Sequence, residues 1–211
     1  FKGFVAGNVD YHSHLDNRLI HDWWTNEEII AETGYSTDLI TRYATAFIER
    51  NPEQPFFLYV PHAAPHDPYE GRNDPPIRLK GKDNRIVEAD DLPGIYKEMV
   101  EVMDEGVGEI MQVLEAKGLS NNTIVIFCSD NGANKRGSNA MLRGYKAGLF
   151  EGGHRVPAIV RWPGKITAGQ TSDETVLSMD FFPTLCEMVG IPLEGRTLDG
   201  QSIAGHLLEG T

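Results

Sequence analysis

Apolar runs of strand length, separated by segments with helical periodicity, constrain the fold of this 211-residue chain more than any other feature. The runs are PFFLYVP at 55–61, TIVIFC at 123–128 and AIVRW at 158–162. The segments with apolar residues at helical spacing are 36–51, 93–117 and 180–190. Runs that are apolar throughout are typical of strands covered on both faces. Their alternation with helices favours an α/β fold in which helices flank a largely parallel sheet.

The ends of the helical segments carry boundary signals. Ser36 can cap the first helix, and Asp180 can cap the last. Asp91 and Pro93 suit the start of the second helix, and Gly118 suits its end. These signals predict three helices with well-defined ends.

Composition restricts the class of protein and of ligand. The length allows a substantial core, and we expect residues 1–211 to form a single α/β domain. The chain has no run of eighteen apolar residues, so nothing predicts a membrane span. The formal charge, 19 − 31 = −12, disfavours binding to nucleic acid or to an acidic membrane. An anionic ligand would therefore need a local cationic cluster or a bound cation. Cys128 and Cys186 have apolar neighbours and are predicted to be buried thiols.

Polar side chains follow two of the predicted strands. His62, His66 and Asp67 come after 55–61, and Asp130 with Asn131 comes after 123–128. In open α/β sheets ligands bind at the carboxyl ends of strands, so we expect these side chains to share one edge. Carboxylate and amide oxygens suit a hard cation such as calcium or magnesium. The alternative is an ordinary Asx turn, which is the commoner use of Asp-Asn-Gly.

Three further features leave their alternatives open. Lys146 lies in the glycine-rich segment GYKAGLFEGGHRVP, where it can hold an oxyanion or be a solvated surface side chain. The proline-rich stretch 65–91 has no clear period, which indicates a functional or mobile connection. Trp23 and Trp24 can contact a sugar, but core positions are the more usual use of such residues.

Three segments together resemble a known family. PFFLYVPHAAPHDPY, NTIVIFCSDNGAN and LRGYKAGLFEGGHRVPAIVRWPGKI occur in this order. This series is similar to formylglycine-dependent sulfatases of the arylsulfatase A and N-acetylgalactosamine-6-sulfatase type, in the alkaline phosphatase superfamily. The resemblance implies an alkaline-phosphatase/sulfatase-like fold. It further implies hydrolysis of a sulfate ester of a sugar or an aryl group, and a periplasmic or secreted location.

The resemblance also implies roles for individual residues. Asp130 and Asn131 match two of the family's four calcium ligands. His66 matches the histidine that contacts the sulfate ester, and Lys146 matches the lysine that holds a sulfate oxygen on the leaving-group side. The further candidates for substrate binding are His62, Asp67, His14 and Arg143.

The chain departs from the family pattern, because the formylglycine motif, the family's N-terminal pair of aspartates and its K-x-H segment are all missing. No C/S-x-P/A-x-R motif, the source of the formylglycine nucleophile, occurs in the 211 residues. We therefore expect an incomplete fold, the central-to-late portion of a sulfatase catalytic domain without the C-terminal subdomain. Such a chain alone should have negligible activity, bind calcium weakly and expose sheet edges that can pair with a partner copy.

Two other functions compete with this interpretation. A hydrolase of phosphate mono- or diesters in the same superfamily would share the metal and the sheet. A non-catalytic fragment that binds anions or sugars would need neither nucleophile nor metal.

Overall fold

The computed structural model describes residues 1–50, 53–81 and 91–209. Contacts divide the chain into two compact units. Unit 1 comprises Phe1–Leu119 and Ser129–Val156, and unit 2 comprises Ser120–Cys128 and Pro157–Thr211. The single domain over 1–211 stays a prediction, and each unit is described by itself.

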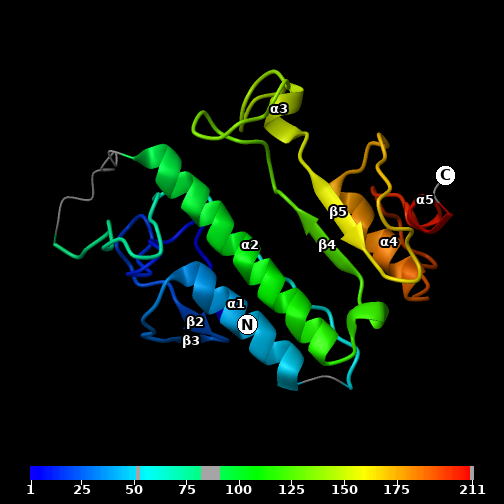
Figure 1. Cartoon of the computed structure of the whole chain (residues 1–211), viewed down its shortest axis with the longest axis horizontal. Coiled ribbons are helices and arrows are strands. Elements are labelled where there is room, and N and C mark those ends of the chain that lie inside the picture. The colour runs from blue at the N-terminus through cyan, green and yellow to red at the C-terminus, as the bar shows by residue number, and fades with distance from the viewer. Residues whose placement is uncertain (51–52, 82–90, 210–211) are drawn as a thin grey trace. The chain divides into compact units, whose positions relative to one another are not determined.

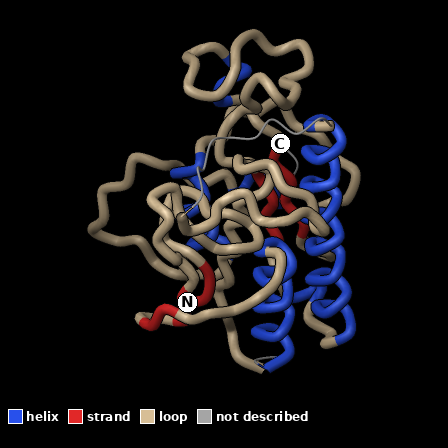
Figure 2. Tube along the Cα trace, turned by 90° about the vertical axis from the view of Figure 1, so that its left-hand side faces the viewer, coloured by secondary structure: helices blue, strands red, loops and turns tan. Residues whose placement is uncertain are grey.

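Two long helices lie side by side in unit 1 (Figures 1 and 2). They are α1 (Ser36–Arg50) and α2 (Leu92–Ala116), as their periodicity predicts. Ser36 is the first residue of α1 and its buried Oγ has no hydrogen-bond partner in the described residues, so the prediction that it caps the helix is wrong. The Asp91 carboxylate accepts a hydrogen bond from Gly94 N at 3.1 Å, which caps α2. Gly106 permits the close approach of the helices, because a Cβ there would lie 2.2 Å from Thr41 Oγ1.

The core of unit 1 forms where these helices meet the N-terminal segment. Met99 and Val102 of α2 pack with Tyr11, and Leu39 of α1 packs with Trp23. Trp23 is fully buried, so the expectation of a core tryptophan is confirmed for that residue. Much of the remainder of unit 1 is loop (Figure 2).

The strands are short, and their pairing differs from the expectation. In unit 1, β1 (Lys2–Gly3), β2 (Trp24–Thr25) and β3 (Glu28–Ile29) form an antiparallel sheet. In unit 2, β4 (Val125–Cys128) pairs antiparallel with β5 (Ala158–Arg161), with Ile126 opposite Val160 (Figure 1). A parallel pair needs a crossover of a dozen or more residues, usually with a helix. The segment between β4 and β5 contains only the four-residue helix α3 (Glu151–His154) and returns in the opposite direction.

Residues 55–61 do not form the predicted strand within the described part of the chain. Val60 packs on the core and Phe56 meets the Phe47 ring edge-on, whereas Phe57 and Tyr59 are 79% and 76% exposed. The segment is therefore covered on one face rather than two. The prediction of a strand covered on both faces is wrong for these residues, because no described strand pairs with the segment and covers its second face.

Unit 2 contains the remaining elements. They are η1 (Ser120–Asn122), η2 (Ser178–Asp180), α4 (Phe181–Met188) and α5 (Ala204–Glu209). Helix α4 is the third predicted helix. The carboxylate of Asp180 accepts hydrogen bonds from Leu177 N and Gln201 N rather than from an amide of α4, so it ties two loops together instead of capping the helix. Cys186 is buried as predicted, but Cys128 is exposed because it ends an uncovered strand.

None of the described helices combines the length and the apolar character needed to cross a bilayer. Part of the proline-rich stretch, residues 82–90, lies outside the described residues, and its expected role is untested there.

Candidate functional site

All eight predicted site residues belong to unit 1 and lie on three stretches of loop. His14, His62, His66 and Asp67 come from its N-terminal half, and Asp130, Asn131, Arg143 and Lys146 come from residues 129–156. We call residues 5–22 the aspartate-held segment and residues 129–156 the glycine-held loop, for the contacts described below.

The imidazole of His66 is oriented by its neighbour in sequence. Its Nδ1 lies 2.9 Å from the backbone oxygen of Asp67 and 3.1 Å from Oδ1 of the same residue. Both are acceptors, so Nδ1 carries a proton and donates it to Asp67. Within the described residues Nε2 makes no hydrogen bond, and it is the nitrogen left for a ligand.

His66 lines a hollow of about 190 Å³ together with Gly7, Asn8 and Asn17, and we call this the His66 hollow. The backbone that carries His66 is also tied down, because its oxygen accepts a hydrogen bond from the Tyr11 hydroxyl at 3.0 Å. The imidazole therefore stands on a fixed backbone at the edge of a concave surface.

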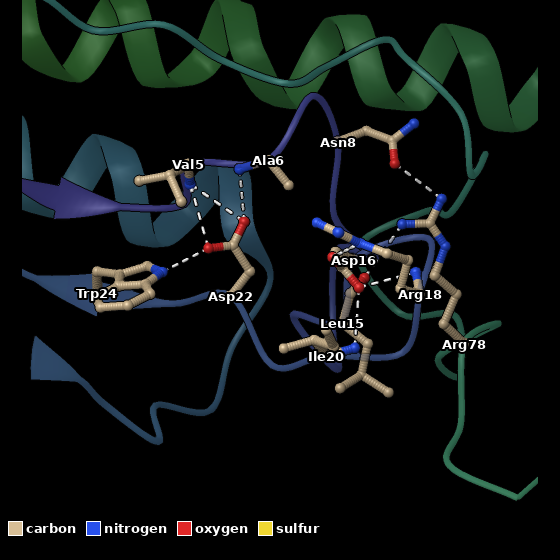
Figure 3. Close-up of polar contacts among 10 residues, drawn as sticks. All are labelled: Val5, Ala6, Asn8, Leu15, Asp16, Arg18, Ile20, Asp22, Trp24 and Arg78. Carbon is tan, nitrogen blue, oxygen red and sulfur yellow. Dashed lines mark hydrogen bonds and ion pairs between the residues drawn. The ribbon is translucent and has the colours of Figure 1, made fainter.

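The aspartate-held segment has almost no regular secondary structure, and three buried carboxylates replace it. Asp22 accepts hydrogen bonds from the amides of Val5 and Ala6 and from the Trp24 indole (Figure 3). Asp16 Oδ1 accepts hydrogen bonds from the amides of Arg18 and Ile20 in its own turn. Asp10 accepts from Ser13 N at 2.7 Å, among others. These bonds satisfy backbone donors that no helix or strand satisfies.

Asp10 is part of a buried pair of acids. Its carboxyl group shares a hydrogen bond with that of Glu70, and both residues are fully buried. Burial and then the charge of Asp10 raise the pKa of Glu70 to about 8. Burial alone would also raise the pKa of Asp10, but donation from the amides of Arg78 and Ser13 lowers it overall. One proton is therefore shared near neutral pH, with Glu70 as its main holder.

The glycine-held loop positions Asp130 and Asn131. Gly132 packs so tightly that a Cβ would lie 1.9 Å from the oxygen of Gly152, and its amide donates to Gly153 O at 3.0 Å. Beside it, Asn131 Nδ2 donates to Asp130 Oδ2 at 2.5 Å. Asp130 is exposed and Asn131 half-buried, so the pair stands at the surface on a rigid support.

Lys146 lies next to this pair in the backbone. Its amide donates to Ala133 O at 2.9 Å, two residues beyond Asn131. The Asn139 side chain reinforces the contact by bonding both Ala133 N and Ala133 O. The side chain of Lys146 is exposed. Arg143 is also exposed and stacks its guanidinium 3.7 Å from the centre of the Phe150 ring.

One hydrogen bond joins the loop that carries His66 to the glycine-held loop. Asn134 Nδ2 donates to the Tyr69 hydroxyl at 2.8 Å. Asn134 is three residues from Asn131, and Tyr69 is three residues from His66. The structure thus ties together the segments that carry His66, Asp130, Asn131 and Lys146.

Two predicted residues lie inside the molecule. His14 is fully buried, stacks on Trp23 at 4.2 Å between ring centres and meets Gly34 O through Nε2 at 3.0 Å. Burial lowers its pKa, partly opposed by the bond to Gly34. A side chain in this position cannot contact a sugar at the surface, which corrects the expectation for His14. Its place in a polar sequence, between Ser13 and Asp16, gave no sign of burial.

His62 is different, because both of its ring nitrogens are buried and neither has a hydrogen-bond partner in the described residues. Burial lowers its pKa to about 4. Burial of an imidazole without a hydrogen-bond partner lowers the stability of the fold. A ligand or another polar group that bonded to either ring nitrogen of His62 would remove that cost.

Asp130 and Asn131 carry oxygen ligands of the type that a hard cation prefers, but they supply too few of them for a complete site. Calcium takes six to eight oxygen ligands. No cluster of three or more histidine, cysteine or acidic side chains able to hold a metal occurs among the described residues. Two oxygen-bearing side chains are a partial site.

Sequence reasoning missed several residues around the His66 hollow. Asn8 and Asn17 line it, while Arg78 and Glu70 support its wall. The segment GNVDYHSHLDN carries many short polar residues, which is a weak sign of turns. Nothing local marks Glu70 or Arg78, because their partners are about sixty to seventy residues away.

Comparison with known proteins identifies the family of the chain. The sulfatase family model matches residues 2–191. Human steryl-sulfatase is 38% identical over 185 residues, covering 82% of this chain and 30% of the relative. Mouse N-acetylgalactosamine-6-sulfatase is 37% identical over 209 residues, covering 93% of this chain and 38% of the relative.

The chain also resembles solved structures in its fold. The crystal structure of Ps i-CgsB matches with a TM-score of 0.84 and 28% identity, over 99% of this chain and 49% of that one. Its complex with k-i-k-neocarrahexaose matches with a TM-score of 0.83 and 27% identity. The predicted α/β fold of the sulfatase type is confirmed. This chain spans 30–38% of the length of these curated relatives and about half of the solved one. The chain belongs to the sulfatase family.

Proposed function

We propose that this chain is part of the catalytic domain of a sulfatase that hydrolyses a sulfate ester of a carbohydrate. One observation carries the proposal: the segments of His66, Asp130, Asn131 and Lys146 are tied together through the Tyr69–Asn134 hydrogen bond. The complex of the related Ps i-CgsB with k-i-k-neocarrahexaose supports a carbohydrate as the class of substrate.

The side chains present can carry part of the chemistry. Cleavage of the S–O bond leaves an alcohol and a sulfuryl group whose oxygens bear negative charge. The ammonium of Lys146 and the Nε2 side of His66 would hold those oxygens, and either group can supply a proton to the departing alcohol oxygen. Positive groups on a chain with a formal charge of −12 also give an anionic substrate a local attraction. The nucleophile, a hydrated formylglycine in this family by resemblance, would come from outside these 211 residues.

Sulfatases are generally metal-dependent, and we propose calcium as the ion. Asp130 and Asn131 would supply two oxygen ligands, and the remaining ligands would come from elsewhere in the whole protein. A divalent ion there would offset charge on the sulfuryl oxygens. Asp67, His62 and Arg143 remain proposals as contributors to substrate binding.

The proposal is tested in the whole protein with two aryl esters that share one leaving group, a sulfate and a phosphate. We expect faster turnover of the sulfate, and a fall of about 10²–10³-fold in kcat for Lys146→Ala or His66→Ala. Lys165→Ala, which removes an exposed lysine of unit 2, is the matched control and should leave kcat unchanged. Preference for the phosphate would favour the phosphoesterase alternative. No turnover of either ester would favour a non-catalytic role.

Two wider expectations belong to the same proposal. The location would be periplasmic or secreted. The uncovered face of residues 55–61, with Phe57 and Tyr59 exposed, would be covered in the whole protein or by a partner copy. Light scattering of the 211-residue chain separates these cases, because a monomer at all concentrations excludes pairing between copies.

A further inference from the structure

The His66 hollow offers a ligand more than the imidazole. Of its four lining residues, two present side-chain amides, Asn8 and Asn17, and one presents only backbone, Gly7. Its volume of about 190 Å³ is below the roughly 300–1,000 Å³ of pockets that enclose a whole drug-sized ligand. It therefore fits one edge of a ligand, next to the group that His66 contacts.

The amide of Asn8 has a defined orientation. Arg78 Nη2 donates to Asn8 Oδ1 at 2.9 Å, so the oxygen faces Arg78 (Figure 3). The amide nitrogen lies on the side of His66. Arg78 is itself fixed, because Nη1 donates to Leu15 O at 3.1 Å and its backbone amide donates to Asp10 Oδ2 at 2.6 Å.

The nitrogen of that amide retains donor capacity. Asn8 Nδ2 lies 3.4 Å from His66 Nδ1, which is longer than a normal N–H hydrogen bond. His66 Nδ1 already donates to Asp67 and is a poor acceptor. One hydrogen of Asn8 Nδ2 lies toward His66 Nδ1, and the other is available to an acceptor oxygen beside the imidazole.

Asn17 stands on a turn that Asp16 makes rigid. Asp16 Oδ1 accepts hydrogen bonds from Arg18 N at 2.8 Å and Ile20 N at 2.9 Å, and Asp16 N donates to Ile20 O at 2.8 Å (Figure 3). Asn17 is exposed, and its side chain makes no hydrogen bond to any described residue. Its amide therefore presents a free donor and a free acceptor at the hollow.

We propose that Asn8 and Asn17 bind the hydroxyl groups of the sugar that carries the sulfate ester, and so make the site prefer carbohydrate sulfates to aryl sulfates. This inference rests on the proposed function. A sugar edge offers hydroxyl groups that both donate and accept, which matches two amides. An aryl ring offers neither, and a site with polar groups built for a hydroxyl discriminates against an analogue that lacks it.

The test compares Asn17→Ala with wild type in the whole protein on two substrates, a sulfated hexose oligosaccharide and an aryl sulfate. We expect kcat/KM for the sugar sulfate to fall about tenfold, the equivalent of one hydrogen bond, mainly through KM. Turnover of the aryl sulfate should stay within twofold of wild type. Asn121→Ala, an exposed amide of unit 2, is the matched control and should affect neither substrate.

A second variant guards against an indirect effect. Asn8→Ala should lower kcat/KM for the sugar more than for the aryl sulfate, although it also borders His66. Equal losses on both substrates, or no loss on the sugar with Asn17→Ala, would overturn the inference and leave the proposed function standing. Absence of sulfate turnover in the wild-type protein would reject both.

Discussion

The aspartate-held segment and the glycine-held loop both position site residues without regular secondary structure, but by different physical means. In the first, buried carboxylates Asp10, Asp16 and Asp22 accept hydrogen bonds from backbone amides. In the second, Gly132 and its glycine neighbours let backbone approach backbone directly. The first depends on ionisation and hydrogen bonding, and the second depends on the absence of a side chain.

This difference makes the two regions vulnerable to different changes. A carboxylate that accepts several amides keeps its role only while its protonation state and partners are kept. A glycine contact is insensitive to pH but cannot accept even one methyl group. The largest expected effect is in the glycine-held loop, the next at Glu70, which contacts Asp10 of the aspartate-held segment, and the smallest at His62, outside both regions.

The largest effect is expected in the glycine-held loop. Gly132→Ala would place a Cβ 1.9 Å from Gly152 O, a backbone atom that cannot rotate away. We expect the free energy of unfolding to fall by more than about 3 kcal/mol, with little dependence on pH. Urea denaturation of the 211-residue chain measures the loss.

Gly108→Ala is the matched control for that change. A Cβ at Gly108 of α2 meets nothing within 4 Å, and alanine is the better helix former. We expect a gain of about 1 kcal/mol. A loss of similar size in both variants would show that packing at Gly132 is not the cause.

The second effect is a pH dependence of stability set by Glu70. Its pKa is about 8 in the folded chain against an ordinary value of 4.5, so the folded state binds the proton more tightly. The stabilising contribution is complete below about pH 4.5 and is lost as pH rises through about 8. Glu70→Gln cannot ionise and keeps a hydrogen for Asp10.

The variant should therefore flatten the stability profile between pH 5 and 9 by roughly 3–4 kcal/mol. Unfolding by urea at several pH values measures this profile. Glu101→Gln, on the exposed face of α2, should leave the profile unchanged. A profile that stays as steep in Glu70→Gln as in wild type would rule out Glu70 as its origin.

The smallest effect concerns His62, whose two ring nitrogens lack partners in the described residues. His62→Leu removes buried polar atoms and should stabilise the chain by about 1 kcal/mol at pH 7. The pKa of about 4 lies below the ordinary 6.5, so the wild type loses stability as pH falls from about 6.5 to 4. The gain should consequently be larger at pH 5.

His154→Leu, at an exposed position of α3, is the control and should bring no gain. If His62→Leu destabilises the chain at both pH values, the imidazole has a structural partner. If it stabilises the chain but lowers turnover in the whole protein, His62 is retained for function at the expense of stability.

Local signals predicted the parts of the fold that local physics controls. The bounds of α1, α2 and α4 follow from apolar periodicity, and the Asp91 cap and Gly118 follow from residue type at a helix end. The candidate residues Asp130, Asn131 and Lys146 were found because they lie in a motif continuous along the chain. Each of these features depends on residues within a few positions of one another.

Contacts between residues far apart in the sequence decided which side chains are buried, exposed or protonated. His14 is buried because Trp23 and Gly34 enclose it, and Phe57 is exposed because no described strand covers its face. Glu70 holds a proton because folding buries it and brings it to Asp10, sixty residues away.

By itself the sequence determined the family, the three helices and which residue types could meet a sulfate ester. Tertiary structure alone decided which of those residues share a surface, which are enclosed, and which neighbours orient them. The physical reason is that helix ends and motifs depend on neighbours along the chain, whereas burial, tautomer and proton sharing depend on groups that only folding brings into contact.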